Sequence, residues 1–346
     1  MPVNIKHIAK ELGIAASTVS RALQGVYGVN EQTRLKVIQK AEELGYVLNL
    51  SARELVKKQT NLIGVFLQET DSEPEARPPF FETFPSLNQQ LKRYNKEIIV
   101  LNVNPYRYER GQYAQLCRMR RLEGSIVMGP LNEFDSFLAD VHASEIPTVM
   151  FDEPTVGKVC SSVTSDDRPG VYQAVKHLIQ RGHRTIGYVN GPSNIYICQL
   201  RKEGYMQALR EFGIPYKPEL TEDSDFSGSG GAQATRNLIG RHLELTAIFY
   251  ANDLMAMGAI SALAAENIHV PRDLSVIGFD GLFLGEYYNP PLTTVKIDDH
   301  RTGIRAADLL VELLSGGSGR FEYIPTTLIE RASVRDVGPK PGDVAI

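Results

Sequence analysis

The sequence predicts an α/β protein with a three-helix head, built around a helix-turn-helix, and two doubly wound parallel α/β subdomains. Apolar residues between positions 4 and 46 recur at helical spacing, whereas from residue 61 short apolar runs alternate with helix-length segments. The length of 346 residues exceeds one ordinary domain and allows two or three with substantial cores.

The first helix is predicted to follow Asn4, which can cap it, and to end at Gly13. Its apolar stripe consists of Ile5, Ile8, Ala9 and Leu12. These residues stand at i, i+3, i+4 and i+7, so they share one helix face. A third helix is predicted to begin after Asn30, to run to Leu44 and to stop at Gly45, a left-handed cap. Its apolar residues are Val37, Ile38 and Ala41.

Between them lies the second half of the helix-turn-helix. Its buried residues are predicted to be Val19, Ala22 and Leu23. Its outward residues are predicted to be Ala16, Ser17, Thr18, Ser20 and Arg21. Hydroxyl groups suit phosphates and arginine suits a guanine edge, so this helix fits a DNA major groove. Helical pairs that merely pack together show the same periodicity.

The net charge of −4 hides an asymmetry along the chain. Residues 1–60 hold nine Lys or Arg and five Glu and carry +4, which leaves −8 for the remainder. A basic head on an acidic body favours phosphate contact by the head alone. A solvated charged surface would explain the charge but not the apolar pattern beneath it.

Seven short apolar runs predict buried parallel strands in the body. They are residues 62–67, 97–101, 124–128 and 147–151, followed by residues 185–189, 246–250 and 274–279. Helix-length segments separate them, as in two successive doubly wound sheets. A cleft between the two subdomains would hold a ligand at the carboxyl ends of the strands.

Several classes of protein are not supported. Cys117, Cys160 and Cys198 are far apart, so neither a disulfide framework nor a zinc site is expected. The phosphate-cradle, nucleophile-elbow and metalloprotease motifs do not occur. The chain has no signal-peptide segment and no run near the ~20 apolar residues that span a bilayer. We expect a cytoplasmic protein that is not an enzyme and uses no cofactor or metal.

Nine short stretches of sequence are more specific than the general pattern of helices and strands. In the head they are Ile5-Lys-His-Ile-Ala9, Ser17-Thr-Val-Ser-Arg-Ala-Leu23, Val29-Asn-Glu-Gln-Thr-Arg34 and Ala41-Glu-Glu-Leu-Gly-Tyr46. In the body they are Gly182-His-Arg-Thr-Ile-Gly187, Asn190-Gly-Pro192, Ala251-Asn-Asp-Leu-Met-Ala-Met-Gly-Ala259, Ser275-Val-Ile-Gly-Phe-Asp280 and Pro291-Leu-Thr-Thr294. Together they resemble the LacI/GalR family of bacterial transcription regulators along nearly the whole chain. The family's effector domain is itself similar to periplasmic sugar-binding proteins.

The resemblance implies a domain plan. It gives a DNA-binding head (1–48), a hinge helix or linker (49–60), an effector-binding and dimerisation domain (61–337) and a flexible tail (338–346). Within the effector domain, the first subdomain comprises about 61–160 and 295–322, and the second about 161–294 and 323–337. The chain crosses between them three times, so the strand near Val295 and the helix from His300 return to the first subdomain.

The resemblance also implies DNA contacts outside the recognition helix. Asn30 is assigned to them, and Ala52, Arg53 and Leu55 inherit the role of a hinge helix that inserts a leucine into the minor groove. Leu48, where the family usually has proline, and Ala15, in place of the usual serine cap, depart from the pattern. A polar linker is the alternative interpretation of the hinge.

Candidate effector-binding residues lie where strands end. Arg201 occupies the position of the family's effector-binding arginine, and Asp280 and Asn252 close two strands. Phe226 matches the aromatic position on which family effectors stack, and Phe80 or Phe81 would face it. The weaker candidates are Asp152 and Tyr196. Alternatively, Arg201 forms a helix ion pair, Asp280 caps a loop and Phe80 belongs to the core.

These features predict a dimeric, ligand-responsive transcription regulator, a repressor that binds a near-palindromic operator. Its expected effector is a sugar or sugar phosphate in the cleft, which must bind one closure state better than the other. The alternatives are a regulator controlled by a protein corepressor, and a solute-binding protein or sugar enzyme with the same body. The DNA-binding head argues against a solute-binding protein and against a sugar enzyme.

Overall fold

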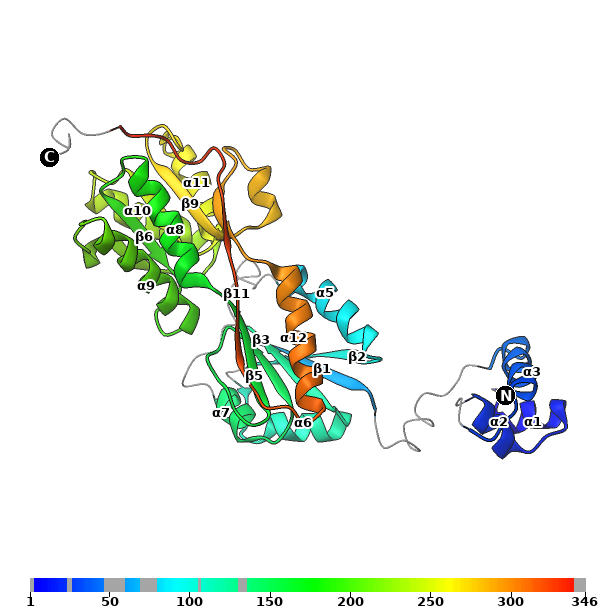
Figure 1. The fold of residues 1–346 in the computed structure, drawn as a ribbon. Helices are drawn as coiled ribbons and strands as arrows, with labels where there is room; N and C mark the ends of the chain where they lie inside the picture. Colours follow the sequence, from blue (N-terminus) through cyan, green and yellow to red (C-terminus); the bar gives the residue numbers. More distant parts are fainter. Residues whose placement is uncertain are drawn as a thin grey trace. The chain divides into compact units, whose positions relative to one another are not determined.

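The computed structural model describes residues 3–23, 27–46, 60–68, 80–104, 107–129 and 136–338 (Figure 1). The chain divides into two compact units, Met1–Thr60 and Asn61–Ile346. The expected hinge residues Ala52, Arg53 and Leu55 lie outside the described residues, as do Leu48 and the tail beyond Gly338. No helix within the described residues is long and apolar enough to cross a membrane.

The head consists of α1 (Ile5–Leu12), α2 (Ala16–Leu23) and α3 (Glu31–Glu43). The side-chain oxygen of Asn4 accepts the backbone N–H groups of Lys6 and His7, at 3.0 and 3.2 Å, and caps α1. Gly13 ends α1 with a φ of 62°, a left-handed conformation that glycine adopts without a steric cost. The predicted start and end of the first helix are therefore confirmed.

The core of the head is small and lies between the three helices. Its buried members are Ile8, Ala9, Val19, Ala22, Val37 and Ala41. Two predictions need correction: Ala16 packs partly against this core instead of facing outward, and Leu23 is only partly buried. Ile38, expected among the apolar residues of the third helix, is 39% exposed and is not among the residues packed in this core.

The first subdomain of the body is a parallel six-stranded sheet in the order β11-β5-β4-β3-β1-β2. Its strands are β1 (Leu62–Gln68), β2 (Glu97–Val103), β3 (Gly124–Met128), β4 (Thr148–Phe151), β5 (Cys160–Ser165) and β11 (Phe321–Ile324). One face packs on α5 (Phe80–Arg93) and α12 (Asp299–Leu314). The other packs on α6 (Gln112–Arg120) and α7 (Ser136–Ala143).

The second subdomain is also a six-stranded sheet, in the order β12-β10-β9-β8-β6-β7. Its strands are β6 (Ile186–Asn190), β7 (Thr221–Asp223), β8 (Ala247–Tyr250), β9 (Ser275–Asp280), β10 (Thr293–Lys296) and the antiparallel β12 (Thr327–Ile329). Helix α8 (Asp167–Gln180) packs against α9 (Tyr196–Glu211), and α10 (Gly228–Arg241) against α11 (Asp253–Ala265). The short 3-10 helices are η3 (Pro218–Leu220) and η4 (Phe283–Glu286).

All seven apolar runs form strands, and the α/β fold class is confirmed. The expectation that the strand near Val295 returns to the first subdomain is wrong. Val295 lies in β10, which pairs with β9 on one side and β12 on the other and so belongs to the second sheet. The predicted boundary between the subdomains, at about residue 160, is also wrong. It cuts through β5, which pairs with β4 and belongs to the first sheet. The chain passes between the sheets after β5, β10 and β11.

Candidate functional site

The outward surface of α2 carries hydroxyl and guanidinium groups. Ser17 and Arg21 are exposed, and Thr18 and Ser20 are partly exposed. Asn30 lies at the start of α3 and caps it: its side-chain oxygen accepts the backbone N–H of Thr33 at 2.7 Å. The described part of the head therefore presents groups that suit phosphates and guanine edges.

Polar residues of the body gather at the carboxyl edges of the two sheets. Five parallel strands of each sheet, numbered along the chain within that sheet, lie in the order 2-1-3-4-5. The strand order therefore reverses beside β1 in the first sheet and beside β6 in the second, and each reversal is a topological switch point. Asp152 follows β4, Asn190 ends β6, Asn252 follows β8 and Asp280 ends β9. In open α/β sheets this edge is where ligands bind.

Arg201 is the centre of this group. It comes from α9 and is only 3% exposed. Its Nε donates to Asp167 Oδ2 at 2.7 Å, its Nη1 donates to the carbonyl of Ala251, and its Nη2 lies 3.8 Å from Asp280 Oδ1. Its guanidinium carbon also lies 4.0 Å from the centre of the Phe279 ring. Arg201 thus forms the ion pair that the alternative interpretation expected, and its role in effector binding stays a prediction.

Asp280 is held in an unusual backbone conformation, with a φ of 106°. Burial raises the pKa of its carboxyl group well above the ordinary range, although Arg201 acts in the opposite direction. The loop after it is fixed by Asp253, whose carboxylate accepts the backbone N–H groups of Gly281 and Leu282 at 2.9 and 2.8 Å. Asp253 was not predicted. It follows Asn252 directly, and an acid in the first turn of a helix at a strand end was the available signal.

The first subdomain contributes two further carboxyl groups. Asp152, with a φ of 57°, accepts a hydrogen bond from Thr164 at 2.7 Å, and burial together with Asp167 raises its pKa to about 6. Asp299, which was not predicted, accepts one from Thr83 at 2.8 Å, and burial raises its pKa to about 6. The charge of Asp152 helps to raise the pKa of Asp299, and the charge of Asp299 helps to raise that of Asp280, so acids of both subdomains lie near one another.

Acidic groups therefore outnumber basic ones around this edge. Asp152 and Asp280 lie near a guanidinium that Asp167 already neutralises, and Asp299 adds a third acid near both of them. Within the described part of the chain, no group of three or more His, Cys, Asp or Glu side chains is arranged to hold a metal ion. The arrangement suits a ligand that donates hydrogen bonds to carboxyl oxygens and brings no negative charge of its own.

Asn252 uses both ends of its amide within the protein. Its oxygen accepts the backbone N–H of Met255 at 2.9 Å, and its nitrogen donates to the carbonyl of Phe226 at 2.9 Å. Phe226 is partly buried and has a φ of 66°. Its ring lies so close to Gly191 that an added Cβ there would come within 2.2 Å of it. Asn252 thus caps α11 and holds the backbone of Phe226.

The remaining predicted residues are dispersed. Tyr196 reaches the first subdomain, where its hydroxyl lies 3.1 Å from that of Tyr323 and its ring meets Phe321 edge-on. It therefore joins the two subdomains at β11. Phe80 and Phe81 begin α5, but their side chains lie outside the description.

Asn190 is a further candidate for effector binding that was not predicted, although it too stands at the end of a strand. It is 1% exposed and its oxygen accepts the hydroxyl of Tyr188 at 2.6 Å. No described residue accepts a hydrogen bond from its amide nitrogen. A buried donor without an acceptor is costly, so a ligand oxygen would stabilise it.

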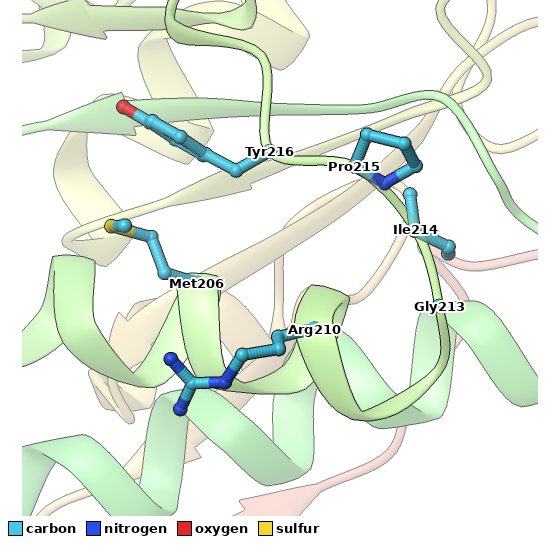
Figure 2. A pocket seen from close by; sticks show the side chains of 6 residues that line it. All are labelled: Met206, Arg210, Gly213, Ile214, Pro215 and Tyr216. Carbon is cyan, nitrogen blue, oxygen red and sulfur yellow. The ribbon is translucent and has the colours of Figure 1, made fainter.

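A hollow in the second subdomain lies elsewhere. It encloses about 360 Å³ beside the end of α9 and is lined by Met206, Arg210, Gly213, Ile214, Pro215 and Tyr216 (Figure 2). It is shallow and its walls are mostly apolar, with Arg210 as the one charged group that lines it. The polar strand ends provide the more specific chemistry, so they remain the candidate site.

Two family models match the sequence. One, described as bacterial regulatory proteins of the lacI family, matches residues 4–49, which contain the three helices of the head. The other, described as a periplasmic binding protein-like domain, matches residues 175–334.

Individual proteins match over nearly their whole length. The Probable HTH-type transcriptional repressor ExuR of Bacillus subtilis (strain 168) is 32% identical over 336 residues, which cover 96% of this chain and 98% of the relative. The HTH-type transcriptional repressor CytR of Escherichia coli (strain K12) is 29% identical and covers 96% of each chain. Among solved structures, the lac repressor dimer bound to operator and the anti-inducer ONPF has a TM-score of 0.81 at 26% identity, covering 97% of this chain and 100% of that one. The CelR–cellobiose complex has a TM-score of 0.73 at 26% identity, covering 96% and 99%.

Proposed function

Because the chain belongs to the LacI family of bacterial regulatory proteins, we propose that it is a dimeric repressor whose binding to a near-palindromic operator is controlled by an uncharged sugar. The head reads the operator and the body holds the sugar. Its named relatives are transcriptional repressors, which agrees with a regulator that catalyses no reaction. The protein would then act in the cytoplasm, where the DNA is.

The DNA-binding part of the proposal assigns base and phosphate contacts to α2. Ser17, Thr18, Ser20 and Arg21 supply the polar groups, while Ala16, partly packed on the core, offers at most a methyl contact. Ala52, Arg53 and Leu55 retain the proposed minor-groove role. The lac repressor, solved as a dimer bound to operator, is similar along nearly the whole chain.

Dimerisation has a physical motive in the second subdomain. Phe283, Leu284 and Tyr287 follow β9 within one short segment and are 64%, 47% and 79% exposed. Exposed apolar side chains that lie so close together favour association with another protein surface. A second copy of the chain is the proposed partner, because a near-palindromic operator requires two heads.

The charge of the candidate site carries the choice of effector. Arg201 is already paired with Asp167, and Asp152 and Asp299, each with a pKa of about 6, are ionised at neutral pH, so a phosphate or carboxylate group would meet repulsion. Sugar hydroxyls, in contrast, can donate to these carboxyl oxygens. Of the two effector classes expected from the sequence, the uncharged sugar is therefore favoured. CelR, a similar structure, is solved with cellobiose.

Each predicted residue then has a role. Arg201, Asp280 and Asp152 would bind the hydroxyl groups, and Asn190 would donate to a ligand oxygen. Phe226, with Phe80 or Phe81, would stack on the apolar face of the ring. Asn252 would act through Phe226, and Tyr196 through its contact with β11.

The proposal can be tested with the full chain and a duplex that it selects from a randomised palindromic library. Affinity for that duplex would be measured with neutral sugars and with the phosphates of the same sugars. We expect at least one neutral sugar to change operator affinity and its phosphate to be inactive. Affinity that no sugar alters would contradict the switch, and a response to phosphates alone would contradict the charge argument.

A further inference from the structure

The amino edge of the first sheet is where the linker enters the body. Three adjacent strands begin there in register, with Leu62 of β1 opposite Glu97 of β2 and Ile63 of β1 opposite Gly124 of β3. The residue immediately before each strand is Asn61, Lys96 or Glu123 respectively. Strand β1 lies between the other two, so its first residues have a neighbour on either side.

These three residues form a compact set of contacts, called here the entry clasp. The carboxylate of Glu123 accepts the backbone N–H of Asn61 at 3.0 Å through one oxygen and pairs with Lys96 Nζ through the other. The side chains of Lys96 and Glu123 are each 16% exposed. On the other side, the carbonyl of Asn61 accepts the backbone N–H of Glu97 at 2.9 Å. Both backbone polar groups of Asn61 are therefore bonded to the body.

Asn61 itself is in the left-handed conformation, with a φ of 54°. Apart from glycine, asparagine is one of the few residues that adopt it at little cost, whereas β-branched residues do so only under strain. A residue with fixed dihedral angles and both backbone groups bonded sets the direction in which the preceding chain leaves the sheet.

We propose that the entry clasp is a positioning device for DNA binding: Glu123, held by Lys96, fixes the direction in which the linker departs from the body at Asn61. This inference rests on the proposed function, since it assumes that the heads bind an operator. Two heads must reach two half-sites together, and a linker that leaves in many directions loses this freedom when the operator binds. A fixed departure direction lowers that entropy cost and so favours operator binding.

The clasp lies at the opposite edge of the sheet from the candidate effector site. Strand β1 has seven residues and would separate the two edges by about 20 Å at ~3.3 Å per residue. Substitutions in the clasp are therefore expected to weaken operator binding and to leave sugar binding to the body unchanged. Glu123 acts on DNA only through Asn61.

The experiment uses the full chain and a duplex that the wild type selects from a randomised palindromic library, with a scrambled duplex of equal length for non-specific binding. We expect Glu123→Ala to weaken specific affinity about tenfold, the scale of one lost charged hydrogen bond, with non-specific affinity unchanged. Lys96→Met, which leaves the acceptor of Asn61 in place, should weaken it less. Glu222→Gln breaks a pair with Arg241 in the second subdomain and serves as the matched control.

Two variants at Asn61 separate positioning from general stability. Asn61→Gly keeps the left-handed conformation and the N–H donor and should stay within a few-fold of wild type, whereas Asn61→Val should reproduce the loss of Glu123→Ala. Thermal unfolding would be followed for every variant. Equal specific affinity in wild type, Glu123→Ala and Lys96→Met would overturn the clasp, as would a loss shared by Glu222→Gln. A wild-type chain that selects no duplex would instead overturn the proposed function, and the clasp with it.

Discussion

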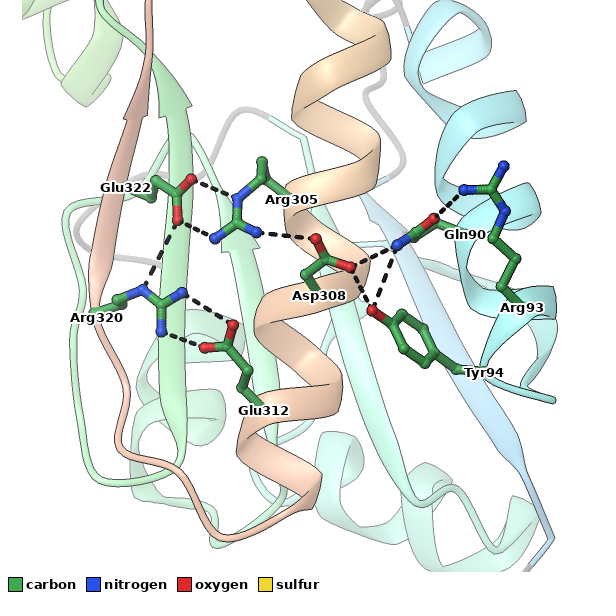
Figure 3. Close-up of polar contacts among 8 residues, drawn as sticks. All are labelled: Gln90, Arg93, Tyr94, Arg305, Asp308, Glu312, Arg320 and Glu322. Atoms are coloured by element: carbon green, nitrogen blue, oxygen red, sulfur yellow. Dashed lines mark hydrogen bonds and ion pairs between the residues drawn. The ribbon is translucent and has the colours of Figure 1, made fainter.

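Two arginines of the body each face two acids, and their surroundings differ. Arg305, on α12, has 27% of its side chain exposed and donates to both oxygens of Glu322, at 2.6 and 2.8 Å (Figure 3). It also donates to Asp308 at 2.9 Å. Arg201 is almost fully buried, is bonded to Asp167 through Nε, and keeps Asp280 at 3.8 Å, beyond hydrogen-bond distance.

The pKa values express this difference. The hydrogen bond between Arg305 and Glu322 raises the pKa of the arginine and lowers that of the glutamate, so both partners favour the charged form. Burial lowers the pKa of Arg201, but Asp167 and Asp280 more than offset it. The pKa of Asp280 nevertheless stays well above its ordinary range. The surface pair is complete, whereas the buried group contains an acid that a ligand can still satisfy.

The largest effect is expected from Arg201→Ala. It would leave Asp167 and Asp280 buried without their cation, which costs about 3–5 kcal/mol in the free energy of unfolding. It would also weaken sugar binding about 100-fold, the upper end of the range for a lost charged hydrogen bond, because the guanidinium carries more than one donor. Urea unfolding and calorimetric titration with the active sugar measure the two effects. Arg305→Ala is the matched control, and an equal loss of sugar affinity in that variant would remove the distinction between the two arginines.

Asp280→Asn should separate binding from stability. Because folding raises the pKa of Asp280, the ionised carboxylate opposes the folded state at neutral pH, so the neutral amide should not lower the free energy of unfolding. Sugar affinity should still fall about tenfold, since an NH2 donor replaces one of the two carboxyl oxygens that accept from ligand hydroxyls. The same two measurements apply. A large loss of stability with unchanged affinity would make Asp280 a structural acid only.

The sequence predicted the apolar framework well and the polar details less well. Strands β1, β3, β8 and β9 are apolar runs, whereas β5 was missed because buried Ser and Thr residues dominate it. Its burial depends on a sheet neighbour far along the chain, which local hydropathy does not reveal.

The candidate site shows the same division. Arg201 and Asp280 were predicted and are brought within 3.8 Å of each other. Asn252 also stands at a strand end, yet its amide caps α11 and holds Phe226. Asp299 reaches the site from α12, after a crossing between the sheets that was assigned one strand too early. Partners chosen by tertiary contact were therefore the part that spacing along the chain did not reveal.

The pH dependence of sugar binding would sharpen the comparison. Burial raises the pKa of Asp152 and Asp299 to about 6, against ~4 in an unfolded chain. The folded state therefore binds protons more tightly, and these groups lower the stability as pH rises from about 4 to about 6. Sugar hydroxyls donate best to ionised carboxylates, so affinity should rise several-fold between pH 5 and 7. Calorimetric titration across this range would measure it.

The control for this pH dependence is the double variant Asp152→Asn and Asp299→Asn, which should bind the sugar with a flatter profile. Glu322 should affect the free energy of unfolding in the opposite direction, because its pKa is lowered in the folded state. Its pair with Arg305 stabilises the fold above about pH 4, and this stabilisation is lost as pH falls further. A wild-type affinity that does not change between pH 5 and 7 would argue against carboxylates as the sugar's acceptors.

The smallest effect is expected from Glu322→Gln. Glutamine keeps one oxygen for Arg305 and loses the charge, and the pair is about one-quarter exposed, so solvent and Asp308 compensate for much of the loss. The free energy of unfolding should fall by about 0.5–1 kcal/mol, as for other partly exposed ion pairs, and sugar affinity should not change. Adding 0.5 M salt should shrink this difference further, because exposed pairs are screened and buried ones much less. A cost as large as that of Arg201→Ala, or one insensitive to salt, would mean that burial does not distinguish the two arginines.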